Sequence, residues 1–333
     1  MQLHDLSGGG DVLERVGAVA RRAVGAYDRG PEVTVELLNV SENATYRVDD
    51  PAVGPTVLRV HRLGYHTKEA IESELAWMDA LRNEAGVRTP AVIPARDGSR
   101  VVAVDDPAIG GTRYCAMFEF LPGREPEEED AASYEELGSL TARMHRHART
   151  WKRPAGFTRF RWDADAAFGD EARWGRWQEG AGVGPAELEV LGRLEQTLRA
   201  RLAAFGTGND RFGLVHADTR LANLLVDDGR VSVIDFDDSG FSWYLYDLGT
   251  SVSFFEHRPH VPELIERWLA GYRTELPLPA EDEDEIWTFI LFRRLLLVAW
   301  IGSHGAVDIA GELGAGYTAQ SCELAERYLS RFG

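Results

Sequence analysis

Residues 212–247 read FGLVHADTRLANLLVDDGRVSVIDFDDSGFSWYLYD. Two short apolar runs in this stretch, Leu224–Val226 and Val231–Ile234, flank the acidic turn at 227–230, which contains a glycine. Short runs of Val, Leu and Ile on either side of such a turn predict a β-hairpin. Because a hairpin brings its two ends together, the polar residues just before and just after it are expected to share one small volume.

The polar residues at the two ends of this hairpin are of the types that phosphoryl transfer requires. They are His216, Asp218 and Asn223 on one side, and Asp235 and Asp237 on the other. The reaction needs a group that holds and deprotonates a hydroxyl, and a divalent cation that neutralises the phosphate oxygens. Asp218 is expected to be that base, while Asn223 and Asp235 offer the hard oxygen ligands that magnesium prefers. The alternative is an acidic surface hairpin whose carboxylates are merely solvated.

The order of these residues resembles the catalytic loop and metal loop of kinases. The pattern is H-x-D-x4-N followed by D-F-x, with Ala217 where protein kinases usually carry Arg. Such spacing is specific enough to be a motif, and its structural context is a strand pair between the Asn and the second Asp. Further kinase-like features in the first half of the chain favour this interpretation over the solvated hairpin.

Composition indicates a globular protein with room for two domains. The chain has 333 residues, 44% of them hydrophobic, and a net charge of −18, which argues against nucleic acid or an anionic membrane as a main partner. The longest apolar run, Leu295–Ile301, is too short to span a bilayer, and no signal-peptide pattern opens the sequence. Two distant cysteines, Cys115 and Cys322, suggest no disulfide framework, so a cytoplasmic location is expected.

The first 120 residues combine helix signals with a series of strand signals. Leu13–Val24 and Thr67–Ala85 carry apolar residues at helical spacing. Six segments read as strands, the first three consecutive and antiparallel: Val33–Val40, Ala44–Val48, Thr56–His61, Val92–Ala95, Val101–Val104 and Thr112–Phe120. Pro122-Gly123 follows the last strand and marks a boundary. That boundary is expected to be the hinge of a kinase, where adenine binds backbone at about Glu119–Leu121.

The loop between the first two strands lies where a kinase has its Gly-rich phosphate cover. It contains Ser41 and Asn43 but no glycine. A small polar loop can still offer backbone N–H groups to phosphate. The alternative is an ordinary hairpin loop.

Arg59 and Glu74 are the candidates for an ion pair that orients phosphates. In a kinase lobe a strand cation pairs with a helix Glu to hold the α- and β-phosphates. The chain has only two lysines, Lys68 at the start of a helix and Lys152 far away in the sequence, so Arg59 is the cation. Glu74 flanks the apolar stripe of its predicted helix; the alternative is a solvated helix glutamate.

The remainder of the chain reads as mainly helical. The predicted helices are Tyr134–His147, Pro185–Phe205, a segment from Tyr246, Pro262–Thr274, Glu281–Ser303 and about Gly316–Phe332. His145 is expected to favour the helix dipole at its helix end, and Asp247 to be a structural anchor. Residues 151–184 are irregular and rich in tryptophan, so they either line a substrate pocket or form a packed insertion.

Residues 214–249 look like the central motifs of the aminoglycoside phosphotransferase and homoserine- and choline-kinase-like superfamily. Leu58–Arg62 and Ile71–Trp77 look closest to its stress response kinase branch. The resemblance implies an α+β, bilobal, protein-kinase-like fold. Residues 1–121 would form an N-terminal lobe with an antiparallel sheet, and residues 122–333 a larger, mainly helical C-terminal lobe that binds the substrate.

The resemblance also implies ATP and Mg²⁺ as cofactors and assigns residues to them. Asp218 is the expected catalytic base, with His216 as a brace of the same loop; the expected magnesium ligands are Asn223, Asp235 and, as a weaker match, Asp237. The nucleotide-binding candidates are Arg59, Glu74, Ser41, Asn43, Glu119 and Leu121. Arg59 departs from the family, which usually has Lys there, and the planar guanidinium differs from a compact ammonium.

The resulting hypothesis is an ATP- and Mg-dependent phosphotransferase. It would move the γ-phosphate to a hydroxyl of a small molecule, such as an amino alcohol, amino acid, sugar or aminoglycoside, with neither nucleic acid nor membrane as a partner. One alternative is a protein Ser/Thr kinase of the stress response kinase type, because fold alone does not select the acceptor. Another is a nucleotide-binding pseudokinase, suggested by Arg59 and the glycine-free loop, although Asp218, Asn223 and Asp235 are all intact.

Overall fold

The computed structural model describes residues 9–40, 43–106, 111–304 and 308–333. The chain forms two compact units, which we call the sheet unit and the helical unit. The sheet unit comprises Met1–Asn83, Thr89–Pro122 and Arg153–Thr158, and the helical unit comprises Glu84–Arg88, Gly123–Lys152 and Arg159–Gly333. The domain boundary between residues 121 and 122 stays a prediction.

Within the described residues, the sheet unit is built on one antiparallel sheet of six strands. Their order is β1-β2-β3-β6-β4, and β5 also pairs with β6. The strands are β1 (Thr34–Val40), β2 (Ala44–Asp50), β3 (Gly54–Val60), β4 (Val92–Ile93), β5 (Val102–Asp106) and β6 (Gly111–Glu119). All six lie where the alternating and β-branched segments predicted them.

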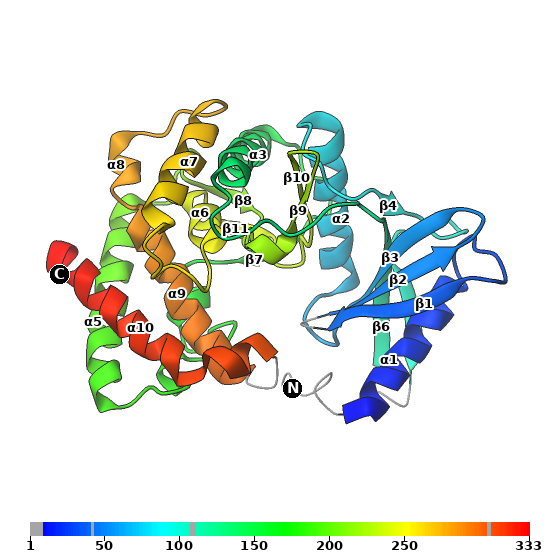
Figure 1. Ribbon diagram of the computed structural model, residues 1–333, viewed down its shortest axis with the longest axis horizontal. Coiled ribbons are helices and arrows are strands. Elements are labelled where there is room, and N and C mark those ends of the chain that lie inside the picture. The colour runs from blue at the N-terminus through cyan, green and yellow to red at the C-terminus, as the bar shows by residue number, and fades with distance from the viewer. Residues whose placement is uncertain (1–8, 41–42, 107–110, 305–307) are drawn as a thin grey trace. The chain divides into compact units, whose positions relative to one another are not determined.

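Two helices complete the sheet unit. Helix α1 (Gly9–Val24) lies along the sheet (Figure 1) and buries its apolar face in the same core as Leu58 and Val60 of β3. Helix α2 (Lys68–Glu84) buries the predicted stripe, which consists of Ile71, Leu75, Met78 and Leu81. Each such buried side chain contributes about 1.5–3 kcal/mol relative to an exposed one, so amphipathic spacing is enough to fix which face of each helix is buried.

The helical unit contains the other helices of the described residues. They are α3 (Ala131–Thr150), α4 (Ala164–Phe168), α5 (Pro185–Phe205), α6 (Leu245–Ser251), α7 (Val261–Arg273), α8 (Ala280–Glu283), α9 (Ile286–Ser303) and α10 (Asp308–Phe332), with short 3₁₀ turns η2 (Trp177–Glu179) and η3 (Leu221–Asn223). The predicted helices are confirmed, except that the segment predicted as one helix over Glu281–Ser303 is divided into α8 and α9. Helix α10 is two helices joined at a kink, where Gly314 has φ 44°, and the predicted segment from Gly316 is the second of them.

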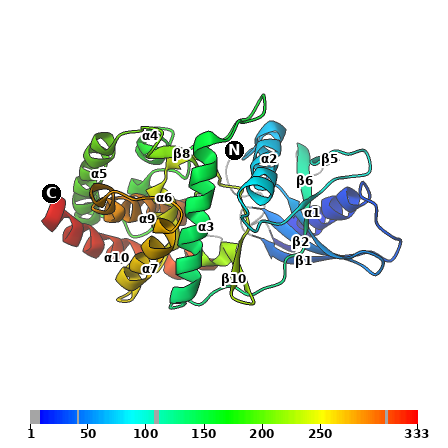
Figure 2. The same cartoon turned by 90° about the horizontal axis from the view of Figure 1, so that it is seen from above.

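Helices α3 and α7 pack at backbone contact, as both ribbon views indicate (Figures 1 and 2). A Cβ added to Gly138 would lie 2.0 Å from the carbonyl oxygen of Trp268, and one added to Gly271 would lie 1.8 Å from that of Glu135. Both distances are far inside van der Waals contact, and backbone has no rotamer by which to move away. Glycine at these two positions is what lets the helix axes approach.

Gly271→Ala is therefore expected to lower the free energy of unfolding by about 1–3 kcal/mol, as overpacking does. Urea unfolding followed by circular dichroism measures the change. Gly192→Ala in α5 is the matched control, because nothing lies within 4 Å of its added Cβ. Alanine in such an open helix position should raise the free energy of unfolding by up to about 1 kcal/mol. Equal effects of the two substitutions would contradict the close packing.

The described part of the helical unit also contains five short strands. They are β7 (Phe160–Arg161), β8 (Phe212–Val215), β9 (Leu224–Asp227), β10 (Arg230–Val233) and β11 (Gly240–Trp243). Strands β9 and β10 form the predicted hairpin, and its turn residues Asp228 and Gly229 both have positive φ, as tight hairpin turns require. Strands β7, β11 and β8 form a second small sheet, which the sequence analysis did not predict.

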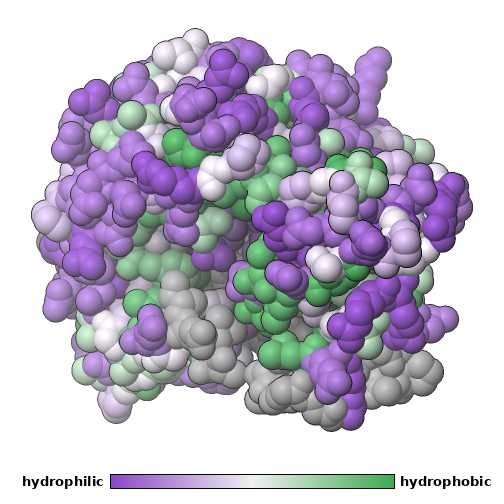
Figure 3. Space-filling model, turned by 45° about the vertical axis from the view of Figure 1, so that its right-hand side comes forward, coloured by the Kyte–Doolittle hydropathy of each residue, from purple (hydrophilic) through white to green (hydrophobic). Residues whose placement is uncertain are grey.

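The apolar run Leu295–Ile301 belongs to a longer helix. Among the described residues, one helical segment, Ala280–Ser303, which comprises α8 and α9, is long and apolar enough to cross a membrane, but 83% of its apolar window is buried inside the structure. A helix that is apolar on all sides and buried is typical of a protein core. The face drawn in Figure 3 is mainly hydrophilic. Among the described residues, the large exposed apolar side chains are Leu37, Leu38, Val53 and Leu188.

Candidate active site

The hairpin brings its two ends together through backbone hydrogen bonds. The N–H of Ile234 donates to the carbonyl of Asn223 at 2.9 Å. The carbonyl of Ile234 accepts a hydrogen bond from Nε2 of His216 at 3.1 Å. Both polar backbone groups of Ile234 are thus held by the loop that contains Asp218. Since Asp235 is the next residue, the structure confirms that the two ends meet.

His216 is a brace in this arrangement. Its Nδ1 accepts a hydrogen bond from the N–H of Asp218 at 3.2 Å, while its Nε2 donates to Ile234. The ring also packs against Phe236, with centroids 4.4 Å apart. Because both ring nitrogens are used by backbone groups, the imidazole holds the loop and has no position left for the acceptor's proton.

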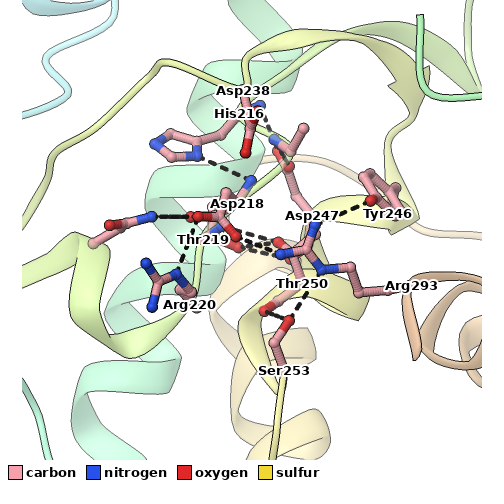
Figure 4. A network of polar contacts seen from close by, with 12 residues as sticks. His216, Asp218, Thr219, Arg220, Asp238, Tyr246, Asp247, Thr250, Ser253 and Arg293 are labelled. Atoms are coloured by element: carbon pink, nitrogen blue, oxygen red, sulfur yellow. Dashed lines mark hydrogen bonds and ion pairs between the residues drawn. The ribbon is translucent and has the colours of Figure 1, made fainter. Parts of the chain in front are cut away.

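Asp218 is the centre of a charged network (Figure 4). Its Oδ1 accepts a hydrogen bond from Nη2 of Arg293 at 2.6 Å. Its Oδ2 accepts from Nδ2 of Asn223 at 2.6 Å and from Nε of Arg220 at 3.2 Å. Burial on its own would raise the pKa of Asp218, but Arg220, Arg293 and His216 outweigh it, and the pKa is lowered. The carboxylate is therefore ionised and fixed in direction.

The residues predicted to hold a metal offer oxygen atoms at this end of the hairpin. The amide nitrogen of Asn223 binds both the backbone and the side chain of Asp218, so its carbonyl oxygen is the atom available to a cation. Asp235 is half-buried and has φ 57°, a left-handed conformation that costs a non-glycine residue about 1–3 kcal/mol. Asp237 is buried nearby. Carboxylate and amide oxygens fit Mg²⁺.

Asp247 fixes the loop that contains Asp218 by accepting hydrogen bonds from its backbone. Its Oδ1 accepts the N–H of Ala217 at 2.7 Å and its Oδ2 the N–H of His216 at 3.1 Å. Ala217 has φ 67°, which leaves two successive N–H groups pointing at one carboxylate. Thr219 adds two bonds, one from its N–H to Oγ1 of Thr250 and one from its hydroxyl to the Asp247 carbonyl. The predicted structural anchor is therefore an anchor of the active-site loop.

His145 of α3 supports Asp247 in turn. Burial lowers the pKa of His145, and Asp247 offsets only part of that shift, so the ring is neutral at pH 7. Its Nε2 donates to Oδ2 of Asp247 at 3.0 Å, and its Nδ1 accepts from the Tyr272 hydroxyl at 3.0 Å. The expectation that His145 favours the helix dipole is wrong, because that role needs a charged imidazole at an exposed helix end.

Asp247→Asn is expected to loosen the loop. Asparagine has one acceptor oxygen where Asp247 accepts three N–H groups, so buried donors lose their partner. The free energy of unfolding should fall by about 2–4 kcal/mol, and phosphate transfer should fall with it; urea unfolding and a turnover assay measure both. Asp165→Asn removes the same charge from a side chain that is 95% exposed and should change stability by less than about 0.5 kcal/mol. Equal stability of the two variants would refute the anchoring role.

Arg59 and Glu74 form the predicted ion pair within the sheet unit. Both side chains are buried, and Nη2 of Arg59 donates to Oε1 of Glu74. The guanidinium also lies over the ring of Phe118, 5.1 Å from its centroid. Glu74 is therefore not a solvated helix glutamate. The part that this pair plays toward phosphate stays a prediction.

The other nucleotide candidates also belong to the sheet unit. Asn43 is buried, and its side-chain oxygen accepts the N–H of Arg62 at 3.1 Å. Ser41 lies outside the described residues. Glu119 is the last residue of β6, and Leu121 follows it as a half-exposed residue. Contact of these residues with a nucleotide stays a prediction.

Sequence reasoning missed the two arginines beside Asp218. Arg293 lies on α9, is buried, and also donates to the Tyr246 hydroxyl at 3.3 Å and to Oγ of Ser253 at 3.2 Å. Burial alone would lower the pKa of Arg293, but Tyr246, Asp218 and Asp238 raise it. A signal existed: arginine within an apolar helix must be paired when it is buried. The sequence pattern did not indicate which residue pairs with Arg293.

The neighbouring Arg294 is occupied elsewhere. It pairs with the buried Glu256, which also accepts the Tyr317 hydroxyl at 2.9 Å. The carboxylate of Glu256 is therefore occupied by Arg294 and Tyr317. In the tryptophan-rich segment, Trp162, Trp174 and Trp177 are all buried, as in a packed insertion, and a part of this segment in a substrate pocket stays a prediction. The ring of Trp174 lies 5.0 Å from the Arg293 guanidinium.

Comparison with known proteins adds independent findings. A model of the phosphotransferase enzyme family matches residues 34–285. The structure of a microcompartment-associated aminopropanol kinase is 49% identical, with a TM-score of 0.88, and covers 95% of this chain and 98% of that one. The amicoumacin kinase of Bacillus subtilis (strain 168) is 26% identical over 271 residues, 78% of this chain and 77% of that protein.

A second solved structure shares the fold. It is an amicoumacin kinase in complex with AMP-PNP and Ca²⁺, 24% identical with a TM-score of 0.77, covering 96% of this chain and 95% of that one. Together with the sheet lobe and the helical region, these likenesses confirm the predicted α+β, protein-kinase-like fold.

Proposed function

This chain belongs to the phosphotransferase enzyme family, and from that premise we propose that it transfers the γ-phosphate of ATP, with Mg²⁺, to the hydroxyl of a small amino alcohol. Family membership and the similar kinases confirm the predicted superfamily and enzyme class. The observation that carries the proposal is the ionised Asp218, fixed by Asn223, Arg220 and Arg293 beside Asp235.

The choice of an amino alcohol as acceptor rests on the similarity of this chain to an aminopropanol kinase. The aminopropanol kinase shares 49% of its residues with this chain over nearly the whole length of both. An amino alcohol is also one of the acceptors that the sequence analysis named, and a net charge of −18 is compatible with a cationic substrate. A protein hydroxyl is the less supported acceptor, because the named relatives are small-molecule kinases.

Asp218 would bind the acceptor hydroxyl and receive its proton. Its lowered pKa makes it a weak base, which suits phosphoryl transfer because the transition state is loose and the proton leaves late. The hydroxyl oxygen forms the new bond to phosphorus, the bond between phosphorus and the departing ADP oxygen breaks, and the proton moves to Asp218. Holding the carboxylate in one direction is then the main contribution of Arg293 and Asn223.

Asn223 and Asp235, with Asp237 beside them, would hold the metal through their oxygen atoms. When bound, Mg²⁺ neutralises phosphate charge that builds up during transfer. The guanidinium of Arg59, oriented by Glu74, would donate hydrogen bonds to the phosphates of ATP. The fold-related amicoumacin kinase was solved with an ATP analogue and a divalent cation, which supports nucleotide and metal use in this fold.

An acceptor screen tests the proposal. The purified protein is mixed with ATP and Mg²⁺, and ADP release is followed with amino alcohols, amino acids, sugars, aminoglycosides and a protein substrate. The expected result is fast, magnesium-dependent turnover with an amino alcohol and loss of turnover with EDTA. Turnover only with a protein would favour the protein-kinase alternative. ATP binding without turnover on any acceptor would favour a pseudokinase.

A further inference from the structure

Arg220 is a charged side chain beside Asp218 whose hydrogen-bonding capacity is only partly used. Its Nε donates to Oδ2 of Asp218 at 3.2 Å, and its side chain is 28% exposed. Within the described residues its two terminal nitrogens have no hydrogen-bond partner, and no dashed line reaches them in Figure 4. One end of this guanidinium is thus fixed on the carboxylate, while the other end is open to a ligand.

The backbone on both sides of Arg220 is fixed. The N–H of Thr219 donates to Oγ1 of Thr250, and its hydroxyl donates to the carbonyl of Asp247. The carbonyl of Arg220 accepts the N–H of Asn223 at 2.9 Å, at the start of η3. The side chain therefore starts from a fixed point and ends on a fixed carboxylate, so its terminal nitrogens are preorganised for a ligand.

Arg293, the other arginine on Asp218, has no such open end. Its Nε, Nη1 and Nη2 donate in turn to Ser253, Tyr246 and Asp218, and its side chain is 3% exposed. Its positive charge offsets the negative charge of the carboxylate, so the charge of Arg220 is in excess. An excess positive charge that is partly open to solvent favours an anionic ligand.

The hydrogen bonds of Asp218 indicate where a reacting phosphate would lie. A carboxylate has about four lone-pair positions, two on each oxygen. Within the described residues Oδ2 accepts from Asn223 and Arg220, whereas Oδ1 accepts from Arg293 alone, so the acceptor hydroxyl is expected on Oδ1. Phosphorus must approach the hydroxyl oxygen to about 3–3.5 Å before the new bond forms. The phosphate oxygens are then beside the carboxylate that holds Arg220.

We propose that the terminal nitrogens of Arg220 bind the phosphate group that is transferred. The inference rests on the proposed function and adds a catalytic residue to it. During transfer the bond from phosphorus to the ADP oxygen breaks, the bond to the acceptor oxygen forms, and the acceptor's proton moves to Asp218. The phosphate oxygens are negatively charged throughout, and the Asp218 carboxylate repels them. The N–H groups of a guanidinium match phosphate oxygens, and its charge offsets that repulsion.

Nucleotide binding tests this contact without any turnover. Calorimetry with Mg²⁺ compares AMP-PNP, which carries a third phosphate, with ADP, which lacks it. Arg220→Met should bind AMP-PNP about 10- to 100-fold more weakly than the wild type, the worth of one hydrogen bond to a charged group, and ADP within about threefold of it. Arg193→Met is the matched control, because Arg193 also pairs with one carboxylate, that of Glu326; it should change neither affinity.

Turnover gives a second readout on the same variants, after circular dichroism has shown that each is folded. The kcat of Arg220→Met should fall about 10²- to 10³-fold, as it does when one donor to a developing negative charge is removed. Arg220→Lys should recover part of that loss, because the ammonium keeps the charge without the planar fork. A lower kcat with unchanged affinity for AMP-PNP would show that Arg220 only orients Asp218, and the inference would be overturned.

The outcomes separate this inference from the proposed function. If the wild-type protein phosphorylates an amino alcohol and Arg220→Met weakens AMP-PNP and ADP equally, the inference fails while the function stands. If Arg220→Met weakens AMP-PNP selectively but the wild-type protein phosphorylates no amino alcohol, the acceptor assignment fails and the phosphate contact stands. A wild-type protein that does not bind AMP-PNP would contradict both.

Discussion

Asp218→Asn is expected to abolish phosphate transfer while nucleotide binding is kept. An amide has no site that takes the acceptor's proton, and loss of a positioned base typically lowers kcat about 10²- to 10⁴-fold. The substitution leaves in place Asn223, which is assigned to the metal, and the Arg59–Glu74 pair, which is assigned to phosphate. Turnover is measured by ADP release, and nucleotide binding by calorimetry with magnesium present.

Stability must be measured on the same variant, because Asp218 neutralises a buried arginine. Breaking a buried ion pair from one side costs about 3–5 kcal/mol when the other charge is left alone. In Asp218→Asn the amide oxygen still accepts from Nη2 of Arg293, so the loss should be smaller than that. Urea unfolding therefore separates an inactive folded protein from an unfolded one. Turnover near the wild-type rate would refute the base assignment.

Arg293→Met is expected to have the second largest effect. It removes the guanidinium that donates to Asp218, Tyr246 and Ser253, and it leaves the buried Asp218 carboxylate paired with Arg220 alone among the described arginines. The free energy of unfolding at pH 7 should fall by about 3–5 kcal/mol. Arg293→Lys is the control: it keeps the charge but not the three-way fork, so its loss should be smaller.

The effect of Arg293→Met on the free energy of unfolding is also expected to depend on pH. In the folded wild type the pKa of Asp218 is lowered, so its ionisation stabilises the protein above the unfolded pKa, and this stabilisation is lost as the pH falls through the folded pKa. Removing Arg293 raises the pKa of Asp218 in the folded state. Arg293→Met should therefore lose less stability than the wild type as the pH is lowered, so that the difference between the two proteins narrows at acidic pH.

Urea unfolding at a series of pH values from about 7 down to about 2, a range that extends below the ordinary pKa of Asp, measures this effect. Arg293→Lys should follow the wild-type curve more closely than Arg293→Met does. Curves of wild type and Arg293→Met that differ by the same amount at every pH would show that Arg293 acts only by packing.

The parts of the site that the sequence predicted are those close together along the chain. His216, Asp218, Asn223 and Asp235 are joined by one hairpin, and a hairpin is readable from alternating apolar residues and its turn. The antiparallel pairing of the first three strands followed for the same reason, since they are consecutive, whereas the position of β6 beside β3 was not predicted. Arg59 was predicted as the cation that pairs with Glu74 because the chain has only two lysines and neither is suitably placed.

The parts that the sequence did not predict depend on contacts between distant segments. Arg293 is 75 residues from Asp218, and His145 is 102 residues from Asp247, so no local spacing connects them. These groups pair because they are buried. The sequence alone does not show that a histidine near the end of a helix is buried. Strands β7, β8 and β11 were missed because each has only two to four residues and, unlike β9 and β10, no short turn joins them to one another.

The central claim is that the Asp218 site moves the γ-phosphate of ATP to the hydroxyl of an amino alcohol. ³¹P NMR of the purified protein with ATP, Mg²⁺ and 1-amino-2-propanol tests it most directly. The account predicts one new phosphate-ester resonance, coupled to the proton of the carbon that carries the oxygen, which grows as the γ-phosphate signal declines and is absent with Asp218→Asn. Formation of only ADP and inorganic phosphate, or of a phosphate ester at the same rate with Asp218→Asn, would contradict it.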